Sequence, residues 1–130
     1  MKTLKGWMMM LVISLCLFGA TACADGALSY EQITPAQAKT LMDTEKEYVI
    51  LDARTAAEFA EGHIENAILI PEYEIAARAE RELPDKDALI LVYCRSGRRS
   101  KIASEELVKL GYTNVKEFGG ILDWPYEIVK

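Results

Sequence analysis

One cysteine in the sequence is followed by a cluster of basic residues. The stretch VYCRSGRRS, residues 92–100, places Cys94 after an apolar run, and three arginines, a glycine and two serines come after the thiol. The chain as a whole is acidic, with 15 basic and 20 acidic residues. Basic neighbours favour the thiolate, which is the nucleophilic form of cysteine. The stretch therefore indicates a cysteine nucleophile with a local anion-binding site beside it.

The other cysteines do not offer Cys94 a disulfide partner. Of the 3 cysteines, Cys16 lies in an apolar N-terminal segment and Cys23 lies at its end, so only Cys94 belongs to the globular part. A lone cysteine is often a small buried hydrophobic residue. The arginines next to Cys94 favour the reactive interpretation over that structural one.

The N-terminal residues are typical of an export signal. Two lysines precede a mostly apolar run over residues 7–18, and small residues follow it. The run is short for a membrane span, although an uncleaved anchor stays open. We assign residues 1–24 to the signal, 25–30 to a short linker and 31–130 to one domain. The protein is expected to be exported to the periplasm or the cell envelope.

The segment ATAC at residues 20–23 allows two kinds of processing. An ordinary signal peptidase could cut before Cys23 or shortly after it. The segment also resembles a bacterial lipobox, in which the cysteine becomes the lipidated first residue of the mature chain. Cys23 is therefore a lipidation candidate, and membrane attachment through it stays open.

Strand and helix patterns alternate along the rest of the chain. Apolar runs predict strands, and amphipathic spacing with N-cap and glycine stop signals predicts helices. The expected strands are 30–34, 47–54, 67–71, 88–93 and 114–118, and the expected helices are 35–42, 55–62, 74–83 and 100–112. This order predicts an α/β fold with a small central parallel sheet flanked by helices.

The predicted fold places Cys94 at the carboxyl end of a central strand. Ligands of open α/β sheets bind beyond the carboxyl ends of the strands, where the next helix offers free N–H groups. A loop over residues 94–99 can turn its amides inward as an anion-binding nest, and Gly97 permits the left-handed conformation that such a turn needs. We therefore expect an active-site loop between this strand and the following helix.

Three segments resemble rhodanese-like sulfurtransferases. The loop around Cys94 resembles their active-site loop, LDARTAAEFAEGHIENAILIP at residues 51–71 resembles their upstream signature, and GYTNVKEFGGILDW at residues 111–124 resembles their C-terminal part. The three segments follow one another at the family's spacing, and the resemblance covers about residues 30 to 130.

This resemblance implies transfer of sulfane sulfur. Cys94 would attack the outer sulfur of thiosulfate or a similar small anionic donor, hold it as a persulfide, and pass it to cyanide or a thiol acceptor. Arg95 and Arg98 are the arginines we favour for donor binding. The implied substrate-binding residues are Arg95, Ser96, Gly97, Arg98 and Arg99. Asp52 and Arg54 are expected to support the neighbouring loops.

Two other functions stay open. Cysteine-dependent phosphatases and arsenate reductases need an arginine six positions after the cysteine, whereas this chain has Ser100 there and Arg99 one position early. The loop length therefore disfavours oxyanion ester chemistry. A rhodanese-like module could also carry persulfide sulfur or bind a partner without turning over free thiosulfate.

Composition argues against several partners. The net charge of -5 argues against general nucleic-acid binding. His63 is the only histidine, so neither a metal site nor a cysteine–histidine pair is predicted around it. We expect no cofactor, no metal and a monomeric protein.

Overall fold

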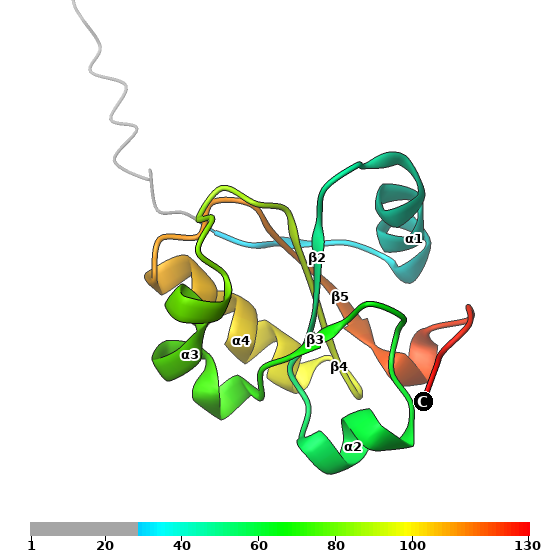
Figure 1. Cartoon of the computed structure of the whole chain (residues 1–130). Coiled ribbons are helices and arrows are strands. Elements are labelled where there is room, and N and C mark those ends of the chain that lie inside the picture. The colour runs from blue at the N-terminus through cyan, green and yellow to red at the C-terminus, as the bar shows by residue number, and fades with distance from the viewer. Residues whose placement is uncertain (1–28) are drawn as a thin grey trace, which may run out of the picture.

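Five parallel strands form the centre of the molecule in the computed structural model, which describes residues 29–130. The sheet order is β1-β5-β4-β2-β3, which places β4 in the middle (Figure 1). The strands are β1 (Glu31–Gln32), β2 (Val49–Asp52), β3 (Ile68–Leu69), β4 (Ile90–Cys94) and β5 (Val115–Gly120). The candidate export signal and Cys23 lie outside the described residues.

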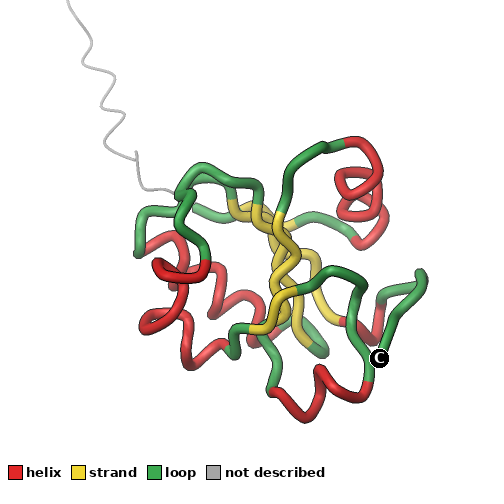
Figure 2. The backbone as a smooth tube through the Cα atoms, in the orientation of Figure 1, coloured by secondary structure: helices red, strands yellow, loops and turns green. Residues whose placement is uncertain are grey.

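Helices cover both faces of this sheet. They are α1 (Pro35–Thr44), α2 (Ala56–Glu61), α3 (Ile75–Glu82) and α4 (Arg98–Lys109), with two 3₁₀ turns, η1 (Glu72–Glu74) and η2 (Ile121–Asp123). Helices α3 and α4 lie on one side of the sheet and α1 lies on the other (Figure 1). Strands fill the middle and helices the periphery, as Figure 2 shows. The α/β fold predicted from the sequence is confirmed.

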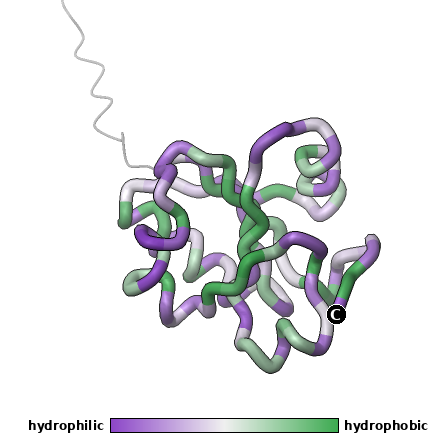
Figure 3. Tube along the Cα trace, in the orientation of Figure 1, coloured by the Kyte–Doolittle hydropathy of each residue, from purple (hydrophilic) through white to green (hydrophobic). Residues whose placement is uncertain are grey.

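The two faces of the sheet carry separate apolar cores. One core joins alternate residues of β2 and β4 to α3 and α4, and includes Leu51, Val92 and Leu107. The other lies under α1 and includes Leu91 and Phe118. All residues of β4 are buried, as expected for a strand covered on both faces. The hydrophobic stretches accordingly gather along the central strands in Figure 3.

Local sequence signals explain where the first two helices begin. The Thr34 hydroxyl accepts a hydrogen bond from the amide of Gln37, and the Gln37 side chain accepts one from the Thr34 amide, which completes a capping box. The Thr55 hydroxyl caps α2 by accepting a hydrogen bond from the amide of Glu58. Each threonine directly precedes its helix and pairs with a backbone N–H of the first turn, so these residues set where the two helices begin.

Helix α4 begins earlier than the sequence predicted. The prediction started this helix at Ser100, but its first residue is Arg98, and Gly97 is the N-cap with a φ of 111°. The loop after Cys94 is therefore shorter than expected, because the left-handed glycine turns the chain straight into the helix.

Between residues 29 and 130, no helix has the length and apolarity needed to cross a membrane.

Candidate active site

The Cys94 thiol lies where the central strand meets α4. Cys94 is the last residue of β4, and its side chain is buried at 1% exposure. The sulfur accepts a hydrogen bond of 3.0 Å from the amide of Gly97. It also donates to the Ser100 hydroxyl at 3.3 Å. The thiol is therefore held between a backbone donor of the loop and a hydroxyl in the first turn of the helix.

The loop is packed tightly against the end of β5. Gly120 pairs with Cys94 across the sheet. A Cβ atom built on Gly120 would lie 1.9 Å from the carbonyl oxygen of Arg95, so no side chain fits at this position. The same carbonyl accepts a hydrogen bond of 3.2 Å from the amide of Leu122. Gly120 thus lets the end of β5 pack directly against the cysteine loop.

The arginines after Cys94 have different surroundings. Arg95 and Arg98 are exposed, whereas Arg99 is half-buried. Arg95 and Arg99 line an open hollow of about 540 Å³, and Arg98 does not line it. Among the other lining residues are Arg54, Glu58, Leu122 and Ile128. Of the two arginines favoured for donor binding, Arg95 thus lies at the hollow and Arg98 does not, whereas Arg99, the third implied arginine, lines it.

Arg99 is paired with an acid that the sequence interpretation did not single out. Its two terminal nitrogens bind the two carboxylate oxygens of Glu58 in α2 at 2.7 and 2.8 Å. The Arg99 hydrogen bond, stronger than the opposing effect of burial, lowers the pKa of Glu58 to about 2. The same hydrogen bond raises the pKa of Arg99. Much of the Arg99 charge is thus neutralised, and Arg95 is the exposed cation of the hollow.

Asp52 and Arg54 form a buried support beneath the site. Arg54 Nε and one terminal nitrogen donate to the Asp52 carboxylate at 2.7 to 3.1 Å, and Arg54 also reaches the carbonyl oxygen of Gly62 at 2.7 Å. The Tyr93 hydroxyl donates to Asp52 at 2.7 Å. It accepts from the amide of Ile64 at 3.1 Å. This network ties β2, β4 and the segment after α2 together.

Burial and the neighbouring carboxylate both act on the Tyr93 hydroxyl. Burial, followed by the charge of Asp52, raises the pKa of Tyr93 above its ordinary value. Tyr93 therefore stays neutral and serves as a hydrogen-bond donor to Asp52.

Two side chains near the thiol were missed by the sequence interpretation. Ser100 was counted only as the residue that replaces a phosphatase arginine, yet its hydroxyl contacts Cys94. Glu117 in β5 is 3% exposed and accepts a hydrogen bond of 2.7 Å from Ser100. The available signal was an acidic residue inside an otherwise buried strand, but its neighbour across the sheet could not be known from one sequence.

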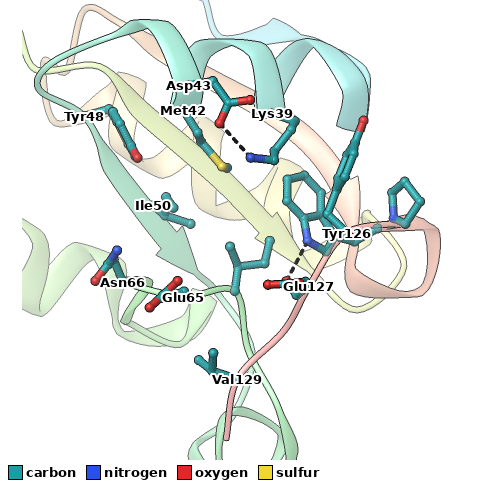
Figure 4. Close-up of a pocket in the computed structure, with 13 residues that line it drawn as sticks. Lys39, Met42, Asp43, Tyr48, Ile50, Glu65, Asn66, Tyr126, Glu127 and Val129 are labelled. Atoms are coloured by element: carbon teal, nitrogen blue, oxygen red, sulfur yellow. Dashed lines mark hydrogen bonds and ion pairs between the residues drawn. The ribbon is translucent and has the colours of Figure 1, made fainter.

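Other parts of the surface lack this combination of groups. Figure 4 shows a hollow of about 660 Å³ beside α1, where Lys39, Asp43 and Tyr126 lie near one another. Its lining contains no arginine, whereas Arg95, the residue after Cys94, lines the other hollow. The buried Cys94 side chain itself lines neither hollow. Within residues 29–130, no three histidine, cysteine, aspartate or glutamate side chains gather as metal ligands would. The hollow beside Arg95 is therefore the candidate active site.

Comparison with known proteins identifies the family of this chain. The family model described as Rhodanese-like domain matches residues 34–126. Thiosulfate sulfurtransferase PspE of Escherichia coli is 38% identical over 73 residues, which are 56% of this chain and 70% of that protein. A sulfurtransferase of Allochromatium vinosum is 42% identical over 85 residues, covering 65% of this chain and 77% of that protein.

A solved structure supports the same relationship. It is described as a rhodanese with anions from E. coli, and it superimposes with a TM-score of 0.60 at 36% sequence identity. The match covers 64% of this chain and 98% of that one. Sequence and fold thus agree over most of residues 29–130.

Proposed function

The chain belongs to the rhodanese-like domain family and is a sulfurtransferase-type enzyme, and we propose that it moves sulfane sulfur through a persulfide on Cys94. In the first half-reaction, the Cys94 thiolate attacks the outer sulfur of thiosulfate, the S–S bond of the donor breaks, and sulfite leaves with the electron pair. In the second, cyanide or a thiolate attacks the outer persulfide sulfur and the Cys94 thiolate is the leaving group.

The position of Cys94 is the observation that carries this proposal. The sulfur lies next to the Gly97 amide and the N-terminus of α4, two features that favour an anionic sulfur there. The exposed Arg95 guanidinium at the hollow fits a small dianionic donor and the sulfite that departs from it. The E. coli relatives named for thiosulfate and for bound anions support this donor class.

The same geometry argues against a phosphatase. Ser100, at the position where a phosphatase loop needs its arginine, turns inward to the sulfur and to Glu117. Arg99, one position earlier, is directed to Glu58. Neither Ser100 nor Arg99 therefore supplies the arginine that a phosphatase loop needs at its end. We expect the wild-type protein to hydrolyse an aryl phosphate far more slowly than it transfers sulfur.

A protein thiol is a second candidate acceptor. Leu122 is 64% exposed and Ile128 is 49% exposed, and both line the hollow beside Arg95. Exposed apolar side chains at the rim of a site are typical of a contact with another protein. In that case the domain would pass its persulfide sulfur to a partner, and free thiosulfate turnover would be slow.

Mass spectrometry tests the persulfide directly. After exposure of the purified protein to thiosulfate, we expect the mass of one added sulfur atom on the peptide that contains Cys94, and its loss after cyanide is added. Cys94→Ser keeps the shape of the site but removes the sulfur nucleophile, so the thiosulfate-to-cyanide activity should fall to background while thermal unfolding changes little. Turnover by the serine variant would exclude the mechanism.

Comparison of acceptors separates the two candidate functions. Leu122→Ala removes an apolar side chain from the rim, adds no charge beside Arg95 and keeps the backbone amide that donates to the Arg95 carbonyl oxygen, so transfer to a protein thiol should weaken while transfer to cyanide persists. Equal effects on both acceptors would argue against a protein contact at this rim.

A further inference from the structure

Glu117 is a buried acidic residue of β5. Glu117 is 3% exposed, and its strand pairs with β1 on one side and with β4 on the other. No lysine, arginine or histidine forms an ion pair with it in the part of the chain that the structure describes. Burial of a carboxylate without a cation is costly, because two neutral donors replace only part of its hydration. We therefore expect Glu117 either to bind a proton or to take part in the function of the site.

The contacts of Glu117 lead to the active-site thiol. One carboxylate oxygen, Oε1, accepts hydrogen bonds from the Ser100 hydroxyl at 2.7 Å and from the Gly119 amide at 2.8 Å. The same Ser100 oxygen lies 3.3 Å from the Cys94 sulfur. Only one hydroxyl thus separates the thiol from the carboxylate. Strand β5 brings the acid to this position, far from Cys94 in the sequence.

The protons available to Ser100 couple the two groups. Ser100 Oγ also lies within hydrogen-bonding distance of the carbonyl oxygens of Gly97 and Gly119, at 3.0 and 3.3 Å. A hydroxyl has a single hydrogen to donate. If Cys94 were a thiolate while Glu117 was ionised, four acceptors would surround that one hydrogen: the Cys94 sulfur, Glu117 Oε1 and the two carbonyl oxygens. The thiolate and the carboxylate therefore compete for one hydrogen, and an added proton on Glu117 relieves the competition.

We propose that Glu117 takes up the Cys94 proton through Ser100 and holds it while Cys94 reacts. The S–H bond breaks and its proton goes to Ser100 Oγ, while the Ser100 hydrogen moves to Glu117 Oε1. The products are a Cys94 thiolate that accepts from Ser100 and a neutral Glu117 that donates to Ser100. No electron is transferred. Glu117 is a positioning residue in this scheme, since it acts on the sulfur through Ser100.

Other charged groups face this pair from the packed elements. Tyr30 lies just before β1. Its burial, followed by the charges of Glu105 in α4 and of Glu117, raises the pKa of Tyr30 above the ordinary value of 10. Arg99 of α4 interacts electrostatically with Cys94 but is held by Glu58. Tyr30 thus titrates outside the neutral range, and Glu58 stays ionised there. Glu105, exposed on the same side, is a suitable control acid.

The alkylation rate of Cys94 tests the shared proton without any sulfur transfer. Iodoacetamide reacts with the thiolate, and the peptide that contains Cys94 can be followed by mass in the full chain. Two groups that share one proton titrate in two steps. We therefore expect two inflections in the pH profile of the wild type and of Glu105→Gln, and one in Glu117→Gln. The inference rests on the proposed function for its role in catalysis, but this readout survives if that function fails.

Infrared difference spectra provide a measurement that needs no variant to fold. At a pH between the two inflections, the unmodified protein should show the C=O band of a protonated carboxyl group. Alkylation of Cys94 makes the sulfur neutral, so Glu117 should release its proton and this band should vanish. A single inflection in the wild type, two inflections in Glu117→Gln, or no such band would each overturn the proposal.

Discussion

Two glycines hold the cysteine loop in different ways. Gly97 has a φ of 111°, a conformation that most other residues adopt only at a cost of about 1–2 kcal/mol. Gly120 has an ordinary extended backbone but no room for a Cβ atom beside Arg95. The first role was visible in the sequence, because a glycine inside a tight loop suggests a left-handed turn. The second was not, because it depends on the contact between β5 and the loop.

Substitution of Gly120 should reduce activity by displacing the cysteine loop. Gly120→Ala places a methyl group 1.9 Å from the Arg95 carbonyl oxygen, so the loop must move. A displacement of reacting atoms by about 1 Å can reduce a rate on the order of 100-fold. We expect a loss of this size in thiosulfate-to-cyanide transfer. Steady-state kinetics on the folded protein measures it.

Gly111→Ala is the matched control for this prediction. Gly111 has a φ of 95° and no atom within 4 Å of an added Cβ, and it follows the end of α4. That variant should lose stability through backbone strain but keep its activity per folded molecule. If the two variants lost activity equally, the contact between Gly120 and the loop would not be the cause.

At the scale of elements, an ion pair joins α2 to α4 across the hollow. Glu58 and Arg99 are 25% and 20% exposed in their side chains, so water screens the pair only in part. The sequence predicted both helices, and it placed Arg99 beside the thiol. It could not predict that Arg99 would bind Glu58, because the two residues are 41 positions apart and meet only when β2 and β4 pair.

Acid should remove the contribution of this ion pair. The pKa of Glu58 is about 2 in the folded protein against an ordinary 4.5, so its carboxylate stabilises the fold at pH values above about 4.5. That contribution decreases as the pH falls from 4.5 toward 2. Glu58→Gln should therefore lower the free energy of unfolding by about 1 kcal/mol near neutral pH, as expected for a partly exposed pair. Urea unfolding at several pH values measures the difference.

Glu61 offers a control on the same helix. It is exposed, and the described structure gives it no ion pair. Glu61→Gln should leave the pH dependence of unfolding near that of the wild type. A difference between wild type and Glu58→Gln that persisted unchanged at pH 2 would contradict the role assigned to the pair.

Tyr93 connects three elements through one hydroxyl. Tyr93→Phe removes the hydrogen bond to Asp52 and leaves the buried amide of Ile64 without its acceptor. Loss of a partner from buried polar groups costs about 1–3 kcal/mol. We expect a loss of that size in the free energy of unfolding with sulfur transfer per folded molecule unchanged. A selective loss of activity at wild-type stability would instead give Tyr93 a role in the reaction.

At the scale of the whole molecule, the sequence predicted the architecture better than the details of the site. Alternating strand and helix patterns were enough for a parallel sheet with Cys94 at a carboxyl edge, because period and caps are local properties. The start of α4 was displaced by two residues, since Gly97 ends the loop sooner than the amphipathic pattern showed. Glu58 and Glu117 reach the site only through the order of the strands.

The N-terminal segment bears on the compartment in which the whole molecule works. The basic, apolar and small segments of residues 1–24 lead us to propose export to the periplasm or the cell envelope. Cell fractionation should therefore recover a chain that lacks Met1. If Cys23 is lipidated, the wild type should lie in the membrane fraction, and Cys23→Ala should move to the soluble exported fraction.

Cys16→Ala serves as the control for this experiment, because Cys16 lies inside the apolar segment rather than at its end. Its fractionation should match that of the wild type. Plain cleavage of the signal would instead leave all three proteins soluble and exported, which would exclude the lipid anchor but not export. Wild-type protein in the cytosol with Met1 still attached would contradict export itself. The donors that reach the hollow beside Arg95 would then be those of the cytosol.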